Sequence, residues 1–180
     1  MYQPTYWLHD NIQFPEHEVE QVSRELKRLG AELTVRGYPA SSYNFKVFNK
    51  PDKIWSKRYN QIVTDITKNI GLNSTSKYNF EYWSQLYTEG TQHNPHHHYE
   101  VEGGHPQISF VHFIKPDAPD SFKFITNDKE DWIPLEQNKG DLIVFPSWCW
   151  HRVTPIKERL VVAGNIDFVH IDDVDIHIYL

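Results

Sequence analysis

The sequence contains one cysteine, Cys149, and no apolar run near the roughly 20 residues that a membrane-spanning helix needs. A single cysteine excludes an intramolecular disulfide framework and a cysteine-based metal motif, and it is typical of proteins in reducing compartments. The first ten residues also lack the basic segment followed by an apolar segment that marks a signal peptide. We therefore predict a cytoplasmic protein with no membrane partner.

The chain also lacks a long stripe of lysine and arginine. Its formal net charge is −6 at pH 7, which argues against a nucleic-acid partner. Hydrophobic residues make up 39% of the sequence and aromatic residues 14%, a composition typical of a folded globular protein. A length of 180 residues favours one domain over two, so we expect residues 1–180 to form a single domain. The sequence does not determine the oligomeric state.

Two helices are predicted in the N-terminal half, over residues 15–30 and 53–70. Pro15 suits the first turn of the first helix, and Asp52 can cap the second. Each range carries an apolar stripe at helical spacing. The stripes are Val19, Val22, Leu26 and Leu29 in the first helix, and Trp55, Tyr59, Ile62, Ile66 and Ile70 in the second.

From Tyr78 onward the hydrophobic period changes to two, and turn residues recur at short intervals, which indicates strands. Helices followed by many short strands predict a mainly β sandwich or barrel with the helices on one outer face. We expect a helical support over 1–77 and a β part over 78–180. The predicted strands are 78–82, 83–88, 93–99, 107–114, 121–126, 141–146, 150–154, 158–168 and 174–179, with shorter strand-like pieces at 33–35 and 44–48.

Six of the 11 histidines fall between His93 and His112. Imidazole is the commonest metal ligand in proteins, and side chains two positions apart on a strand point to the same face. His96 and His98 stand in that relation, and the best remote third ligand is His151. We therefore predict a mononuclear metal site formed by these three histidines.

The other histidines of this region are interpreted as structural or solvated. His93, His97 and His105 are expected in solvated loops, and His112 is expected to be a hydrogen-bonded core residue or to line a cavity.

The segment 158–168 alternates between two kinds of face. One face is an ordinary apolar core, whereas the other carries the guanidinium of Arg159 among small and polar residues. An arginine that points into a cavity needs an anion, and its planar fork suits a carboxylate. The alternative is a structural ion pair with Asp141 or Glu158.

Several short motifs follow one another along the sequence, and in this order they resemble the motifs of the iron(II)- and 2-oxoglutarate-dependent oxygenases. The chain looks closest to a small branch with uncharacterised bacterial and phage members that carry His-x-His in place of His-x-Asp. The resemblance covers about Tyr82 to Phe168. The motifs are Tyr87-x-x-Gly90, His96-x-His98, Gly140-Asp141-x-x-x-Phe145-Pro146-Ser147, His151, Glu158-Arg159 and Asn165.

The resemblance implies a double-stranded β-helix, also called a jelly roll and cupin-like, with the metal at its open mouth. The expected activity is a dioxygenase that uses Fe(II), 2-oxoglutarate and O2, hydroxylates an unidentified peptide side chain or small metabolite, and releases succinate and CO2. The residues implied are His96, His98 and His151 for Fe(II), and Arg159, Tyr87, Gln85 and Asn165 for the cosubstrate.

Two departures from the family pattern keep alternatives open. A carboxylate usually completes the metal triad, and the phasing His98-x-Glu100 with His151 would restore one. The family often has Ser or Thr two residues after the arginine, where this chain has Val161. The competing functions are a three-histidine cupin-type dioxygenase or isomerase that does not use 2-oxoglutarate, and a non-enzymatic jelly-roll binding module.

Overall fold

The structure is a computed structural model, and it describes residues 4–33, 38–44, 50–72, 77–99, 107–116, 118–155 and 157–170. Its helical elements are α1 (Glu16–Leu33), α2 (Ser56–Asn69) and the short 3-10 helices η1 (Ser42–Asn44) and η3 (Pro51–Trp55). Its strands are β1 (Trp7–Asn11), β2 (Ala40–Ser41), β3 (Lys77–Tyr87), β4 (His93–His96), β5 (Ile108–Lys115), β6 (Phe122–Ile125), β7 (Asp131–Trp132), β8 (Asp141–Pro146), β9 (His151–Val153) and β10 (Arg159–His170).

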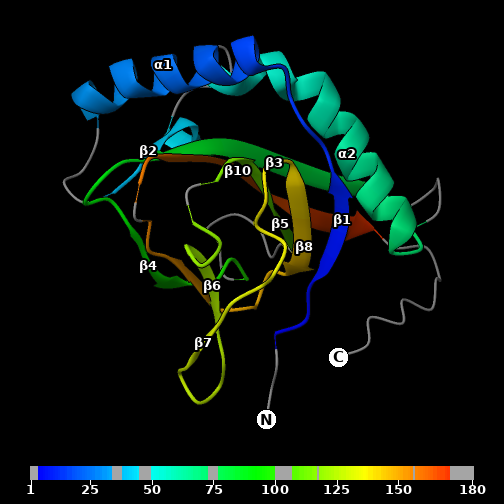
Figure 1. Cartoon of the computed structure of the whole chain (residues 1–180). Helices are drawn as coiled ribbons and strands as arrows, with labels where there is room; N and C mark the ends of the chain where they lie inside the picture. The colour runs from blue at the N-terminus through cyan, green and yellow to red at the C-terminus, as the bar shows by residue number, and fades with distance from the viewer. Residues whose placement is uncertain are drawn as a thin grey trace.

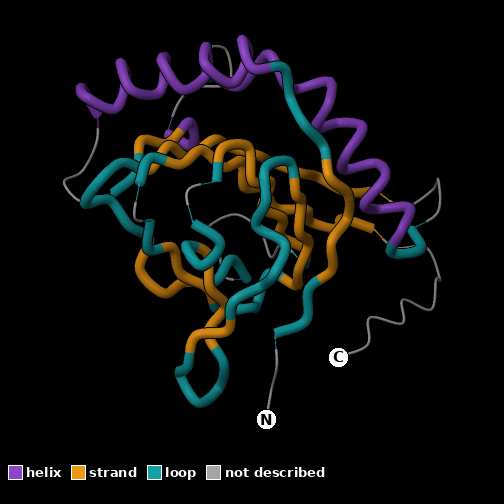
Figure 2. Tube along the Cα trace, viewed as in Figure 1, coloured by secondary structure: helices purple, strands orange, loops and turns teal. Residues whose placement is uncertain are grey.

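Within these described ranges the strands form two antiparallel sheets. The large sheet has six strands in the order β1-β8-β5-β10-β3-β2, and the small sheet has four in the order β4-β9-β6-β7. Both long helices lie over one face of the large sheet, and the small sheet lies on its other side (Figure 1). The tube view shows the same layering, with helices, large sheet and small sheet in succession (Figure 2).

The apolar stripes of the helices explain this layering. Val22 and Leu26 of α1 and Val63 and Ile66 of α2 are fully buried, and they contact the outer face of the large sheet. Burying a side chain of this size contributes roughly 1.5–3 kcal/mol. No helix in the described ranges is both long and apolar enough to span a membrane.

A second core fills the space between the two sheets and forms the floor of the candidate site. Its buried members are mostly aromatic and β-branched: Tyr87, Val111, Phe113, Phe122, Phe124, Ile143, Phe145, Cys149, Val153 and Val161. Strand β10 separates the two cores, because Leu160, Val162 and Ile166 belong to the helix-side core and Val161 to the core between the sheets. The predicted alternation between a core face and a cavity face is thus confirmed from Arg159 to Ala163, whereas Gly164, predicted on the core face, also lines the cavity.

The predicted mainly β architecture with two helices on one outer face is confirmed, with local differences. The stretch 53–70 begins as the 3-10 helix η3, and α2 itself begins at Ser56. The strands predicted at 78–82 and 83–88 are one continuous strand, β3, because both parts pair with β10 without interruption. Leu33 ends α1, whereas 34–35, 45–48 and 174–179 lie outside the described residues.

Candidate metal centre

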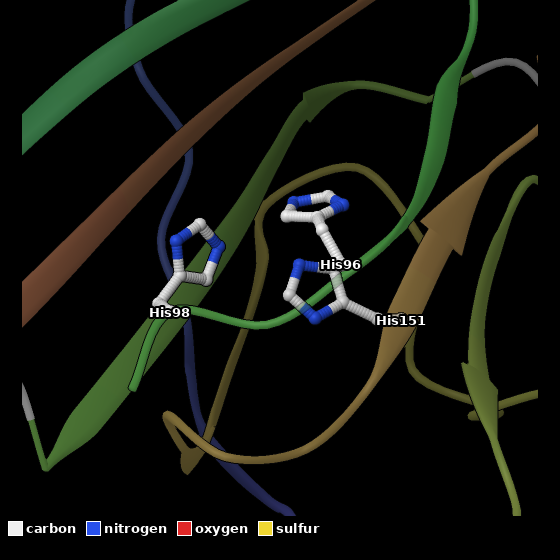
Figure 3. A group of neighbouring side chains, drawn as sticks. All are labelled: His96, His98 and His151. Carbon is white, nitrogen blue, oxygen red and sulfur yellow. The ribbon is translucent and has the colours of Figure 1, made fainter. Parts of the chain in front are cut away.

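Three imidazole rings converge at one side of the space between the sheets. His96 and His98 come from the segment that contains β4, and His151 comes from β9; the three rings point toward a common centre (Figure 3). One ring nitrogen from each lies within 4.8 Å of the others. The ring centroids are 4.3 Å apart for His96 and His151, and 5.1 Å apart for His98 and either partner. The three residues predicted from the sequence therefore form one compact group.

The backbone brings these side chains together in a way that simple strand alternation does not describe. His96 and His151 are Cα partners in the β4–β9 pair, which has an irregular register between His93 and His96. His98 lies beyond the end of β4, where its backbone N–H donates to the Ser147 carbonyl at 2.9 Å. The convergence is as predicted, but a bend after β4, rather than one strand face, orients His98.

The hydrogen bonds of two of these histidines leave a nitrogen free for a metal. Nδ1 of His96 lies 2.8 Å from the Asn94 carbonyl oxygen, and Nδ1 of His151 lies 3.0 Å from that of Cys149. A carbonyl oxygen only accepts, so each Nδ1 carries the proton and each Nε2 keeps its lone pair. Such hydrogen bonds to backbone carbonyls also fix the ring orientation, as is usual for metal-binding histidines.

Burial keeps all three imidazoles neutral. Desolvation lowers the pKa of His98 to about 3, with further contributions from the neighbouring His96 and His93. Desolvation also lowers the pKa of His151 well below its usual range. It lowers the pKa of His96 as well. Neutral imidazole is the form that binds metal ions, so three such donors fit a divalent transition metal without prior loss of protons.

The three histidines line a cavity that also contains Arg159. Besides the histidines, its wall is formed by residues of both sheets: Trp83, Gln85, Tyr87, His93, Ser109, Phe110, Val111, Phe122, Phe145, Val153, Arg159, Val161, Ala163 and Gly164. The free space of this cavity is about 400 Å³, a volume that includes the part open to solvent. A guanidinium and three convergent imidazoles therefore share one largely apolar cavity.

Arg159 is a fully buried cation on the cavity wall. Its guanidinium lies over the rings of Tyr87 and Phe113, 5.3 and 5.6 Å from their centroids, and donates to the hydroxyl of Ser121. A planar guanidinium on a cavity wall offers N–H groups that suit a carboxylate, so a carboxylate that enters the cavity fits this arrangement.

The two carboxylates considered as structural ion-pair partners of Arg159 are engaged elsewhere. Glu158 accepts from Lys27 and Lys115, at 2.7 and 2.8 Å. Asp141 accepts from the side-chain amides of Asn11 and Asn138. Both carboxylates thus have other partners, and Arg159 lines the cavity.

Tyr87 and Gln85 lie on the cavity wall beside Arg159, and a third residue joins them. Tyr87 is the Cα partner of Arg159 across the β3–β10 pair, and its hydroxyl donates to Oε1 of Gln85 at 2.9 Å. The same hydroxyl lies 2.9 Å from Nδ1 of His93. The expectation that His93 sits in a solvated loop is wrong, because strand β4 carries its ring into the cavity, where it meets Tyr87 and the ring of His96.

Asn165 was expected with the cosubstrate residues, and it lies behind the cavity wall, bonded to the cavity-lining Ser109. It lies six residues beyond Arg159 on β10, which is about 20 Å at roughly 3.3 Å per residue. Its amide accepts from Ser109 at 2.9 Å and donates to Glu81 at 3.3 Å. Asn165 thus connects strands of the large sheet and does not line the cavity.

Three other histidines of the region 93–112 and Glu100 were also considered from the sequence. His97 is half-buried and lies outside the group of three, and its ring centroid is 4.6 Å from that of Trp150. His112 is a core residue, as predicted, with Nδ1 2.8 Å from the Tyr59 hydroxyl and Nε2 2.7 Å from the Ile12 carbonyl. His105 and Glu100 lie outside the described residues.

Comparison with known proteins identifies the architecture. No family model and no curated protein matches the sequence. Among solved structures, a Pseudomonas putida prolyl-4-hydroxylase is 19% identical, with a TM-score of 0.60 over 91% of this chain and 92% of that one. A collagen prolyl hydroxylase of Paramecium bursaria Chlorella virus-1, solved with 2-oxoglutarate, is 14% identical, with a TM-score of 0.56 over 92% and 96%. The chain has the fold of these oxygenases.

The oxygenase fold also extends beyond prolyl hydroxylases. SnoN, a non-heme α-ketoglutarate-dependent epimerase of nogalamycin biosynthesis, is 12% identical, with a TM-score of 0.58 over 91% of this chain and 77% of that one. The predicted double-stranded β-helix is therefore confirmed. At these identities the likeness concerns the fold, and the reaction must be argued from the cavity of this chain.

Proposed function

We propose that the chain is an Fe(II)- and 2-oxoglutarate-dependent dioxygenase of the hydroxylase type. The observation that carries this proposal is one cavity that joins three neutral imidazoles to a buried guanidinium. In this proposal His96, His98 and His151 hold Fe(II). Arg159 binds the far carboxylate of 2-oxoglutarate, as in the family that the motifs resemble.

The residues of the chain then have distinct tasks. Bound Fe(II) would supply the redox chemistry that couples O2 and 2-oxoglutarate to oxidation of a substrate C–H bond, with release of succinate and CO2. Arg159 orients the cosubstrate, because a guanidinium held between two aromatic rings offers its N–H groups in a fixed direction. Phe122, Phe145 and Val153 form an apolar wall that excludes water from the reacting groups.

The fold supports the reaction class and leaves the substrate class broad. The neighbours with this fold are named as prolyl hydroxylases, which include one in complex with a peptide of hypoxia inducible factor, and as an epimerase of nogalamycin biosynthesis. A peptide side chain or a small metabolite as primary substrate therefore stays our proposal. The likeness to the His-x-His branch and the cytoplasmic location likewise rest on the sequence alone.

Binding of the cosubstrate tests the proposal without a known substrate. Calorimetric titration of 2-oxoglutarate into the Mn(II)-loaded protein should show one site, with no saturable binding to the metal-free protein. Arg159→Ala should weaken it about a hundredfold, since removing one partner of a buried charge pair costs roughly 2–5 kcal/mol. Arg152→Ala is the matched control, because Arg152 pairs with Asp131 on the outer face of the small sheet.

The same titration distinguishes the proposed function from a second candidate function. Three neutral histidines without a carboxylate also form the donor set of the cupin-type enzymes considered above, which do not use 2-oxoglutarate. If 2-oxoglutarate binds Arg159→Ala as tightly as the wild type, the cosubstrate assignment fails and this second candidate is favoured. If no metal binds, both enzymatic functions fail.

A further inference from the structure

Two hydrogen bonds connect three side chains along the cavity wall between the three candidate metal ligands and Arg159. The hydroxyl of Tyr87 is 2.9 Å from Nδ1 of His93 and 2.9 Å from Oε1 of Gln85. All three residues line the cavity, and Tyr87 is fully buried. This His93–Tyr87–Gln85 chain begins next to a metal ligand, since the rings of His93 and His96 are 4.8 Å apart.

The hydrogen bonds of this side-chain network have a fixed direction, because a tyrosine hydroxyl has one proton to donate. Tyr87 donates that proton to Oε1 of Gln85, which is a carbonyl oxygen. Its oxygen must therefore accept from His93, so Nδ1 of His93 carries a proton. With Oε1 engaged by Tyr87, the group that Gln85 has left for a ligand is its amide nitrogen, which has two N–H donors.

The register of the strands places this amide where a donor is needed. Gln85 is the Cα partner of Val161, and Val161 is two residues after Arg159. Where the related oxygenases often have a hydroxyl that donates to the cosubstrate carboxylate, Val161 offers none. An amide from the facing strand can replace that hydroxyl, since N–H groups bind carboxylates through charge-assisted hydrogen bonds.

We propose that His93 is a positioning residue that acts through Tyr87 to turn the N–H groups of Gln85 toward the carboxylate held by Arg159. The inference rests on the proposed use of 2-oxoglutarate and assigns a selectivity role to residues beyond the metal ligands and the arginine. In the reverse direction, Gln85 would donate to Tyr87 and turn its carbonyl oxygen toward the carboxylate, which would repel it. The proton on Nδ1 of His93 therefore selects for a dicarboxylate.

The test compares two 2-oxo acids that differ only at the far end. 2-Oxoglutarate has the second carboxylate, whereas 2-oxopentanoate has the same metal-chelating end and a methyl group instead. Both are titrated calorimetrically into Mn(II)-loaded protein. His93→Phe keeps a ring but removes the N–H donor, and it should raise the Kd of 2-oxoglutarate about tenfold while leaving that of 2-oxopentanoate unchanged.

Two further variants guard the test against a folding defect. His93→Asn retains an N–H donor near the position of Nδ1 and should bind 2-oxoglutarate nearly as the wild type does. Tyr87→Phe removes only the hydroxyl that joins the chain, and it should show the same selective loss as His93→Phe.

The possible outcomes are distinct. An equal loss for both acids in His93→Phe would mean that His93 acts on the metal through His96, and it would overturn the inference. Unchanged binding of both acids in both His93→Phe and Tyr87→Phe would also overturn it. A wild-type protein that does not prefer 2-oxoglutarate over 2-oxopentanoate would instead refute the proposed function itself.

Discussion

His96 and His151 are paired residues of neighbouring antiparallel strands, and their ring centroids lie 4.3 Å apart. The pair is separated by 55 positions in the sequence, so the pairing of β4 with β9 determines the distance between two of the three candidate ligands. His98 completes the group from a bend held by the Ser147 carbonyl. The geometry of the metal site is therefore a property of backbone hydrogen bonds at one edge of the small sheet.

The histidine run 96–98 offers an internal comparison for metal binding. His98 belongs to the triad, whereas its neighbour His97 is not part of it and contacts Trp150. We expect His98→Ala to weaken Co(II) binding about a hundredfold or more, and His97→Ala to change it less than threefold. Competition with a chromophoric chelator measures both constants, and equal losses in the two variants would contradict the assignment of the triad.

His112 predicts a pH dependence of stability away from the metal site. Desolvation lowers its pKa from 6.5 to about 4, so the unfolded chain binds a proton between these values that the folded chain does not. The contribution of His112 is fully present above pH 6.5 and is lost as the pH falls toward 4, by about 3 kcal/mol in total.

Denaturant unfolding at pH 7, 6 and 5 checks this prediction. His112→Gln does not titrate, and it should show a flatter decline of the unfolding free energy toward pH 5 than the wild type. Because the other buried histidines are present in both proteins, the difference between the two curves isolates His112. Parallel curves would show that His112 does not supply the dependence.

The fully buried carboxylate of Asp52 connects η3 to the large sheet. Its Oδ2 accepts from the hydroxyls of Ser42 and Ser84 and from the backbone N–H of Ser84, at 2.7–2.8 Å. Asp52→Ala should lower the free energy of unfolding by about 3 kcal/mol or more, because it leaves buried donors unsatisfied. The control Asp65→Ala removes an exposed carboxylate bonded to Gln61 and should change stability by less than about 0.5 kcal/mol. Similar effects of both variants in thermal or urea unfolding would refute this role.

Gly164 marks a place on β10 where no side chain fits. A Cβ there would lie 2.5 Å from Cε1 of Phe110 and 2.7 Å from the backbone oxygen of Glu81. We expect Gly164→Ala to destabilise the protein by about 1–3 kcal/mol through overpacking. Adding Phe110→Leu should recover part of that loss, because the leucine side chain ends short of the clash. Strictly additive effects in the double-mutant cycle would argue against the contact as the cause.

Much of the fold followed from hydrophobic periodicity, and the exceptions are weakly patterned elements. The helices over 15–30 and 53–70 and most strands after Tyr78 were predictable because their apolar residues recur at a clear period. Strand β1 is absent from the prediction because it is an edge strand whose residues are largely exposed or half-buried. Strand β7 has two residues, too few to show any period.

The candidate site was predictable where residue type alone restricts the chemistry. Three histidines in a suitable order and an arginine on a polar strand face are rare enough to indicate a site. The role of His93 was not predictable, because it depends on the irregular β4–β9 register and on the hydroxyl of Tyr87. The bonding of Asn165 also required the structure, since its partners Ser109 and Glu81 come from the two neighbouring strands.

The anaerobic absorption spectrum of the protein with Fe(II) and 2-oxoglutarate tests the proposed function most directly. Chelation of Fe(II) by the 2-oxo acid should produce a weak visible charge-transfer band in the wild type. His151→Ala should lack the band, and Arg159→Ala should require about a hundredfold more 2-oxoglutarate to reach it. Iron bound stoichiometrically without any such band in the wild type would contradict the proposed function.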